Sequence, residues 1–321
     1  MVKNMVKHFI DLDDISSSDL REIIELANKL KKEYKDKGRA FKKQGELLAH
    51  KNLAMIFEKT STRTRVSFDV GINQLGGNSI VMNKNDMQLV KGESAADTAR
   101  ALSRYVDGIM IRAISHDTIV DIAKYSDVPV INALSDFSHP CQILASVMTI
   151  EERIGNIEGK KLSWFGDANN VLNSYIHGAK KFGYELTMAI PKDSHLKEFD
   201  LCDAEIKKAQ DSGSKVTVVN DPKVAAEGAE VMITDTWFSM GDETEHNDAL
   251  KQKKINVLKP YQVNSELMSL ASKDAIFTHC LPAYREYEVT SEVIESDASV
   301  VFDEVENRLH IQKAIMLWTM G

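Results

Sequence analysis

The residues best suited to chemistry stand in a six-residue run, TSTRTR at 60–65, directly after the apolar run LAMIF at 53–57 and before a helical pattern. A helix start presents free N–H groups and the positive end of the helix dipole, so it attracts phosphate or carboxylate. Hydroxyl groups add donors, and a guanidinium adds a bidentate fork. The side chains available for such an anion are Ser61, Thr62, Thr64 and either Arg63 or Arg65.

The common phosphate-binding loops do not account for this run, because neither G-x-x-x-x-G-K-[ST] nor G-x-G-x-x-G occurs in the chain. We therefore expect a small phosphate compound as the ligand. Taken alone, the run is explained equally well if Ser61 or Thr62 only caps the helix and the arginines are surface charges.

Four further polar clusters follow along the chain. SHPCQ at 138–142 opens a long helical pattern, while GDANN at 166–170, DTWFSMG at 235–241 and HCLP at 279–282 each follow a β-rich run. Ligands of open parallel sheets bind beyond the carboxyl ends of the strands. We therefore expect all of these clusters to line one cleft.

The elements that must position these clusters alternate between short β-rich runs and helical patterns, which is typical of α/β folds with parallel sheets. A first helix is expected over SSSDLREIIELANKL at 16–30, capped by a serine or by Asp19. Further helices are expected near residues 70, 100 and 120. The strands expected in the first half are Leu53–Phe57, Ser79–Met82, Gly108–Arg112 and Val128–Asn132.

A second alternation begins after the long helical pattern HPCQILASVMTIEERIG at 139–155, and the chain closes on another helical pattern, VENRLHIQKAIMLWTM. The pattern predicts an α/β protein of two doubly wound domains, joined near residue 150, each with a central parallel sheet flanked by helices. The strands expected in the second half are Lys161–Phe165, Glu185–Ile190, Lys215–Val219, Glu230–Thr234 and Ala275–His279.

Charge narrows the class of partner. The 321 residues carry a formal charge of −8, with a pI near 5.7, which argues against a general attraction to nucleic acid or acidic membranes. An anionic ligand would need local basic groups. The lysine-rich segment 29–43 is interpreted as a solvated helix face and loop, with an anion-binding patch as the alternative.

The three cysteines, Cys141, Cys202 and Cys280, stand far apart and form no C-x-x-C pair, so neither a disulfide framework nor a zinc site is indicated. The first residues, MVKNMVKHFIDLDD, carry charges where a signal peptide needs an apolar stretch, and no run approaches the length of a membrane span. We expect a soluble protein of the reducing cytoplasm, with no metal.

Six motifs, taken together, resemble those of ornithine carbamoyltransferases in order and spacing. They are FEKTSTRTRVSF, SHPCQ, GDANN, DTWFSMG, HCLP and DEVENR. The similarity extends from about residue 8 to the C-terminal helix. It implies a carbamoyl phosphate-binding domain at 1–150, onto which a helix from about residue 303 packs back, and an ornithine-binding domain at 151–302.

The resemblance implies roles for the residues of the first domain. Arg112, His139 and Thr64 would polarise the carbamoyl oxygen, Gln142 would hold the carbamoyl amide, and Arg308 would add a further contact, unless it forms only a salt bridge at a helix end. The residues implied to bind carbamoyl phosphate are Ser61, Thr62, Arg63, Thr64, Gln88, Arg112, His139, Gln142, Cys280, Leu281 and Arg308.

The resemblance also implies the second substrate. The Cys280 sulfur and the Leu281 carbonyl would lie beside the reacting amine of ornithine, with Arg112, His139 and Cys280 as the catalytic residues. The alternative for Cys280 is a buried thiol without reactivity, and packing roles are expected for Cys141 and Cys202. Asp235 with Ser239 would bind the α-ammonium, and Asn170 with the Met240 backbone the α-carboxylate.

The implied reaction is direct attack of the neutral amine on the carbamoyl carbon, followed by departure of phosphate, without any cofactor. In the family, the loop matching NKNDMQLVKGES at 83–94, read here as too polar for a regular element, reaches the neighbouring subunit's site through Gln88. A homotrimer with shared sites is therefore implied, against the alternative of an ordinary surface loop. Departures from the family pattern are Val90, Lys91, Ala168 and Tyr284.

Other functions remain open at this stage. A carbamoyltransferase for putrescine would need no loop for an α-carboxylate, and one for aspartate would need a basic pocket where Asp235 and Cys280 stand. A homologue that binds anions without turnover is a third possibility. If ornithine is the substrate that receives the carbamoyl group, the same site would serve citrulline formation for arginine biosynthesis or the reverse reaction in arginine breakdown.

Overall fold

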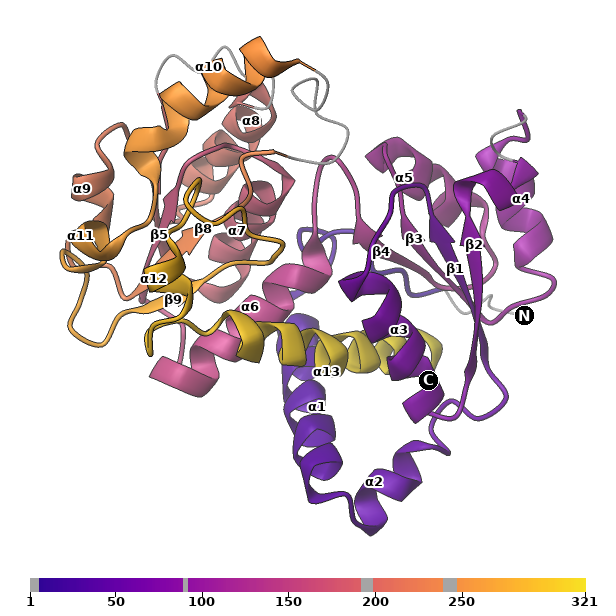
Figure 1. The fold of residues 1–321 in the computed structure, drawn as a ribbon. Helices are drawn as coiled ribbons and strands as arrows, with labels where there is room; N and C mark the ends of the chain where they lie inside the picture. The colour runs from indigo at the N-terminus through magenta and orange to yellow at the C-terminus, as the bar shows by residue number, and fades with distance from the viewer. Residues whose placement is uncertain (1–5, 89–91, 192–198, 239–246) are drawn as a thin grey trace. The chain divides into compact units, whose positions relative to one another are not determined.

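The computed structural model describes residues 6–88, 92–191, 199–238 and 247–321, and Figure 1 shows its elements. The chain divides into two compact units, one made of 1–145 with 306–321 and the other of 146–305. Each unit contains one sheet, and every strand pairing in both sheets is parallel. The predicted class, two α/β domains with parallel sheets, is confirmed.

The sheet of the first unit has four strands in the order β2-β1-β3-β4. Its strands are β1 (Asn52–Phe57), β2 (Asn78–Asn83), β3 (Gly108–Arg112) and β4 (Val130–Leu134). Strand β1 is buried over five of its six residues because it is paired on both sides and is apolar from Leu53 to Phe57. The carboxyl end of β1 is followed by the TSTRTR run, which leads into a helix.

The helices of the first unit begin where the sequence offers caps. Ser16 and Ser94 accept hydrogen bonds from the backbone N–H of Asp19 and Asp97, so each fixes a helix start. The helices are α1 (Ser17–Asp36), α2 (Arg39–Gln44), α3 (Arg63–Gln74), α4 (Ala95–Leu102) and α5 (His116–Tyr125), together with the last residues of α13 (Val301–Met320).

The sheet of the second unit has five strands in the order β7-β6-β5-β8-β9. The strands are β5 (Lys161–Phe165), β6 (Glu185–Ala189), β7 (Val216–Val219), β8 (Val231–Thr234) and β9 (Ile276–Thr278). Its longer helices are α7 (Asn170–Phe182), α8 (Phe199–Asp211) and α10 (Asp248–Leu258), and α6 (Pro140–Ile154) enters it from the first unit. Its shorter helices are α9 (Pro222–Ala226), η4 (Lys259–Tyr261), α11 (Ser265–Met268) and α12 (Ser291–Ile294).

Two predicted details differ from the structure. Strand β4 begins at Val130, two residues after the predicted start at Val128, because Pro129 has no N–H to donate to a neighbouring strand. The loop predicted to lack any element contains, in its described part, the 3₁₀ turn η1 (Lys84–Asp86), which Asn83 and Asp86 close by reciprocal side-chain capping.

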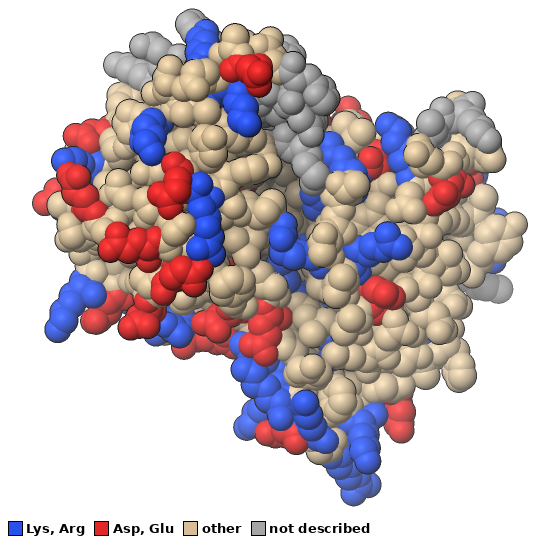
Figure 2. All heavy atoms as spheres, in the orientation of Figure 1, with Lys and Arg blue, Asp and Glu red and all other residues tan. Residues whose placement is uncertain are grey.

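The lysine-rich segment lies on α1, α2 and the turn between them. Figure 2 shows Lys and Arg gathered there, at the lower end of the view. The side chains of this segment's basic residues are exposed except for Lys31, which is buried and donates to Asn307 Oδ1 at 2.7 Å. The arrangement fits the solvated-face interpretation. Among the described residues, no helix is both long and apolar enough to cross a membrane.

Candidate active site

The TSTRTR run lies at the start of α3, as its composition predicts. Thr62 occupies the N-cap position but makes no side-chain cap hydrogen bond in the described structure, so simple capping by Thr62 does not explain the run. Thr64 is only 1% exposed, whereas Ser61 and Arg63 are half-buried and Thr62 is exposed. Hydroxyl groups therefore surround a helix N-terminus, the arrangement that binds anions.

Thr64 accepts hydrogen bonds from two guanidinium groups that come from distant parts of the chain. Its Oγ1 accepts from Arg308 Nη2 at 2.9 Å and, over a longer 3.4 Å, from Arg112 Nη1. Arg112 ends β3 and Arg308 lies on α13. All three residues belong to the first unit. Two fixed positive charges beside a helix N-terminus form a strong site for a phosphate or another oxyanion.

His139 lies near these arginines, directly before the first residue of α6. Burial, then the charges of Arg308 and Arg112, hold the pKa of His139 well below its usual range. The imidazole is therefore neutral at pH 7 and can act as a hydrogen-bond donor without adding a third positive charge. Gln142, one turn into α6, is fully buried.

The backbone before His139 is held by a small polar network. Asn132 Nδ2 donates to Ser138 Oγ at 3.2 Å, and the Ser135 N–H donates to the Ser138 carbonyl at 2.9 Å. Cys141 donates to the Asn132 carbonyl at 3.3 Å, and burial raises the pKa of this thiol to about 12. Cys141 is therefore an inert packing residue, as predicted.

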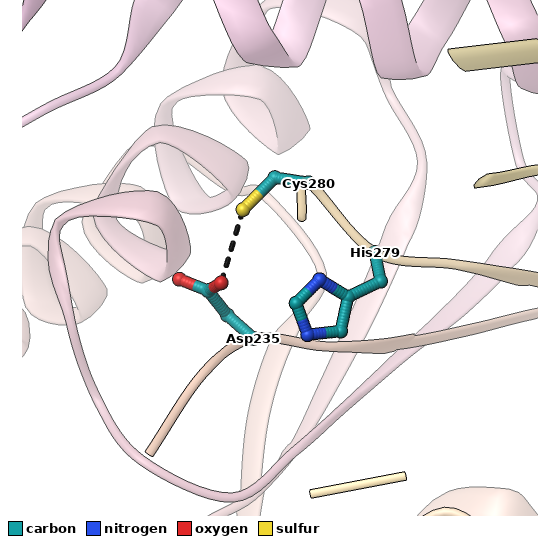
Figure 3. A group of neighbouring side chains, drawn as sticks. All are labelled: Asp235, His279 and Cys280. Atoms are coloured by element: carbon teal, nitrogen blue, oxygen red, sulfur yellow. Dashed lines mark hydrogen bonds between the residues drawn. The ribbon is translucent and has the colours of Figure 1, made fainter. Parts of the chain in front are cut away.

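A second polar cluster lies in the other unit, just past the ends of β8 and β9. The Cys280 thiol donates to Asp235 Oδ1 at 3.0 Å, and Asn169 Nδ2 donates to Asp235 Oδ2 at 2.8 Å. Figure 3 shows Asp235 and Cys280 pointing toward one another, with the His279 ring beside them. Asp235 is buried and Cys280 is half-buried, so the pair offers a carboxylate and a soft sulfur to a ligand.

His279 holds the HCLP segment in place. Its Nδ1 accepts from the Leu281 N–H at 2.9 Å, and its Nε2 lies 3.3 Å from Glu288 Oε1. Candidate metal-ligand atoms of Asp235, His279 and Cys280 lie within 4.8 Å of one another. Because both ring nitrogens of His279 are engaged, we interpret this group as a hydrogen-bonded cluster and not as a metal centre.

The GDANN segment is tied to α10 by a buried ion pair. Lys254 Nζ lies 2.7 Å from Asp167 Oδ2, and both side chains are at most 5% exposed. The neighbouring Ala168 is buried at 1% exposure. Asn170, half-buried, is the first residue of α7. The segment that carries the predicted Asn170 is therefore anchored from two sides, by a helix cap and by a charge pair.

Several predicted residues fall outside these clusters. Gln88 is exposed. Tyr284 is 45% exposed, with its ring centroid 5.9 Å from that of Phe238. The predicted Ser239 and Met240, the glycine Gly241, and the departures Val90 and Lys91 lie outside the described residues.

Sequence reasoning assigned no role to three residues that shape these clusters. Asn169 had a usable signal, since an Asn immediately before a helical pattern predicts a cap. Glu288, which accepts from the Tyr284 N–H at 2.5 Å as well as contacting His279, has no local signature. Lys254 looks like any lysine of a helix surface until the structure places it against Asp167.

Comparison with known proteins agrees with this geometry. Residues 7–152 match the family model described as the aspartate/ornithine carbamoyltransferase carbamoyl-P binding domain, and residues 158–319 match the Asp/Orn binding domain of the same family. The chain is 49% identical to an ornithine carbamoyltransferase of Ruegeria pomeroyi over 98% of this chain and all of that protein.

Two further relatives extend the comparison. An ornithine carbamoyltransferase of Rhodopseudomonas palustris is 50% identical, covering all of this chain and 99% of its own length. The solved structure of ornithine carbamoyltransferase from Pyrococcus furiosus aligns with a TM-score of 0.88 at 44% identity, covering 100% of this chain and 99% of that one. The chain belongs to the aspartate/ornithine carbamoyltransferase family, among its ornithine carbamoyltransferases.

Proposed function

We propose that this protein transfers the carbamoyl group of carbamoyl phosphate to the side-chain amine of L-ornithine, giving L-citrulline and phosphate. The observation that carries the proposal is the Asp235–Cys280 pair. An amino-acid substrate such as ornithine has a cationic α-ammonium and reacts through a neutral side-chain amine. The ammonium needs a carboxylate partner, and the amine needs a soft, uncharged hydrogen-bond acceptor. Aspartate as the substrate would require basic side chains at this position, and neither Asp235 nor Cys280 is basic.

The first unit binds carbamoyl phosphate in this proposal. Ser61, Thr62, Arg63 and Thr64 hold the phosphate at the start of α3, with Arg308 beside them. Gln142 holds the carbamoyl amide. The cationic, hydroxyl-rich surroundings of Thr64 support this assignment, because a dianionic phosphate is stabilised by fixed guanidinium groups and a helix N-terminus.

Arg112 and His139, with Thr64, stabilise the oxygen that becomes negative when the amine attacks. A tetrahedral oxyanion gains most from donors that are already oriented before the reaction. Arg112 contributes a permanent charge, and the low pKa of His139 supports a neutral imidazole that donates a hydrogen bond. Collapse of the intermediate then expels phosphate, so the carbon–nitrogen bond forms and the carbon–oxygen bond to phosphate breaks.

The second unit prepares the nucleophile. An amine with an ordinary pKa near ~10.4 costs roughly 4–5 kcal/mol to deprotonate at pH 7. The Cys280 sulfur and the Leu281 carbonyl accept hydrogen bonds from the neutral amine and so favour that form. Asp235 with Ser239 binds the α-ammonium, and Asn170 with the Met240 backbone binds the α-carboxylate. The lone pair of the amine then attacks the carbamoyl carbon, and the amine's proton leaves with solvent or phosphate.

The working form of the enzyme is, in this proposal, a cytoplasmic homotrimer that uses no cofactor. Gln88 completes the carbamoyl phosphate site of the adjacent subunit, which agrees with its exposure in a single chain. Citrulline formation would place the enzyme in arginine biosynthesis. The same site also catalyses the reverse reaction, because a catalyst accelerates both directions.

The test is product formation by the purified protein from carbamoyl phosphate with ornithine, putrescine or aspartate offered in parallel, with Cys280→Ala as the matched variant. We expect citrulline from ornithine alone, a rate that rises as pH favours the neutral amine, and a much lower rate in the variant. Turnover of another amine would keep the carbamoyl phosphate half of the proposal and refute the ornithine half. Binding of carbamoyl phosphate without any turnover would indicate a non-catalytic homologue.

A further inference from the structure

Asn169 performs two tasks with the two ends of one side-chain amide. Its Oδ1 accepts from the backbone N–H groups of Val171 and Leu172, at 3.0 and 3.1 Å, and so caps α7. Its Nδ2 donates to Asp235 Oδ2 at 2.8 Å. Because the two N–H groups require an oxygen on their side, the amide has one orientation, and its nitrogen must face Asp235.

The two tasks have different chemical requirements. Asn, Asp and Ser cap helices about equally well, since each supplies an oxygen. Only Asn can cap with an oxygen and at the same time donate from a nitrogen on the opposite side. Asn169 is 4% exposed, so the contact with the carboxylate lies away from competing water. An asparagine at position 169 therefore indicates a second role for this side chain besides capping α7.

We propose that Asn169 is a positioning residue for the ornithine subsite, which holds the Asp235 carboxylate in the rotamer that directs Oδ1 to the Cys280 thiol. The inference rests on the proposed function, which assigns Asp235 to the α-ammonium of ornithine. With Oδ2 anchored by Asn169, the carboxylate cannot rotate freely, and the distance between the ammonium site and the sulfur is set. Asn169 itself touches neither substrate in this proposal.

Charged and titratable groups surround this contact within the described residues, among them Tyr175 of α7, which interacts electrostatically with Cys280. Cys280 faces Asp235 Oδ1, and His279 lies beside it on the same segment. Asp167, two residues before Asn169, is paired with Lys254 of α10. The Cys202 thiol of α8 lies 3.7 Å from the Asn169 carbonyl oxygen. No cation among these groups directly neutralises Asp235. In Asn169→Asp, the negative charge of one carboxylate would therefore strongly disfavour ionisation of the other.

The test compares Asn169→Ser with Asn169→Asp, because both keep a capping oxygen and both lose the amide N–H that donates to Asp235. We expect each to raise KM for ornithine about 10- to 100-fold, the loss typical of a hydrogen bond to a charged group, with KM for carbamoyl phosphate unchanged. In Asn169→Asp the two carboxyl groups share a proton as pH falls, and the protonated one donates again. Its KM relative to wild type should therefore recover from pH 9 to pH 6, whereas that of Asn169→Ser should not.

The matched control is Asn264→Asp, which makes the same change at another Asn cap of this unit, where Oδ1 accepts from the Leu267 N–H at 2.9 Å. It should leave KM and its pH dependence unchanged. Wild-type KM for ornithine in Asn169→Ser, or an equal pH response in both Asn169 variants, would overturn the proposal. Matching thermal unfolding of all variants would exclude a general folding defect.

A readout without turnover separates this inference from the proposed function. A thiol that donates to a carboxylate is held in its neutral form, so Cys280 should be alkylated faster by iodoacetamide at pH 8 in Asn169→Ser than in wild type. Faster alkylation in a protein that makes no citrulline would refute the proposed function and keep Asn169 as the anchor of Asp235. Unchanged alkylation in an active enzyme would refute the anchor alone.

Discussion

Neighbouring groups decide what each reactive side chain can do. Thr64 is an ordinary hydroxyl until Arg308 and Arg112 donate to it, and His139 is an ordinary imidazole until burial and those two arginines keep it neutral. The three thiols differ for the same reason. Cys141 and Cys202 are fully buried, while Cys280 is half-buried beside Asp235.

Thiol accessibility gives a first prediction. In the native protein, a bulky disulfide reagent should modify one thiol per chain, Cys280, because Cys141 and Cys202 have no exposed surface and the pKa of Cys141 is raised to about 12. Mass spectrometry of the modified protein identifies the site. Cys280→Ala should abolish the reaction in the native state and leave two reactive thiols after unfolding. Labelling of native Cys280→Ala would contradict the burial of the other two.

His139 gives a second prediction. His139→Ala should lower kcat about 100- to 1,000-fold, the usual loss for one oxyanion donor, and His139→Gln should lose less because an amide still donates. Since the pKa of His139 is already far below 6.5, this residue stays neutral across the assay range. Both variants should therefore keep the acid limb of the wild-type pH–rate profile, which belongs to the amine. A shifted limb in His139→Gln would show that His139 titrates during the reaction.

At the scale of elements, buried polar contacts connect helices to the strands and loops that carry the site. Lys254 joins α10 to the loop after β5, and Lys313 of α13 donates to Gln44 at 2.5 Å and to Gln74, the last residue of α3, at 3.0 Å. Arg308 contacts the beginning of α3, so α13 holds that helix at both ends. Such contacts cost desolvation and give a defined geometry in return.

The Lys254–Asp167 pair gives a third prediction. Lys254→Met should destabilise the protein by about 3–5 kcal/mol, because it leaves a buried carboxylate without its charge partner. The double variant Lys254→Met with Asp167→Asn should recover part of that loss. The more exposed pair Lys160–Glu230 is the control, and Lys160→Met should cost less than about 1 kcal/mol. Denaturant titrations measure the wild type and the three variants, and equal costs for the two lysines would refute the role given to Lys254.

Lys313 gives a fourth prediction, at the helix-packing level. Burial lowers the pKa of its ammonium from 10.5 to about 8, while Glu33 opposes part of the shift. Between pH 8 and 10.5 the unfolded chain then binds more protons than the folded one at this site, so stability should rise with pH. Relative to Lys313→Met, the wild type should gain unfolding free energy from pH 8 to pH 10. A constant difference, measured by urea unfolding, would show that Lys313 titrates normally.

At the scale of the whole molecule, each unit carries one of the two polar clusters described above. The proposed trimer adds Gln88 of the adjacent subunit to the carbamoyl phosphate site. The purified protein should sediment at about three times the 35.9 kDa of one chain. Gln88→Ala and Arg112→Ala should each be nearly inactive. Mixed trimers of the two should regain activity in about one of their three sites, because an intact Gln88 meets an intact Arg112 at one subunit junction. Absence of recovery in verified mixed trimers would refute sharing through Gln88.

The sequence by itself determined the elements and the family. Apolar runs, caps and turn residues act over a few neighbours, so eight of the nine strands lie within a residue of their predicted limits or inside them, and only β4 is shifted, by Pro129. The motifs after the strand ends could be located because parallel strands present their carboxyl ends to ligands. The six motifs in order then identified the relatives that the comparisons confirm.

Only the tertiary structure decided which groups meet. Arg308 reaches Thr64 across 244 residues, and Asn169 reaches Asp235 across 66. Local periodicity contains no information on such contacts, because they arise when whole elements pack. The neutral state of His139 likewise depends on burial and on charges from two other elements. Residue type supplied the available chemistry, and packing determined which side chain of each type performs it.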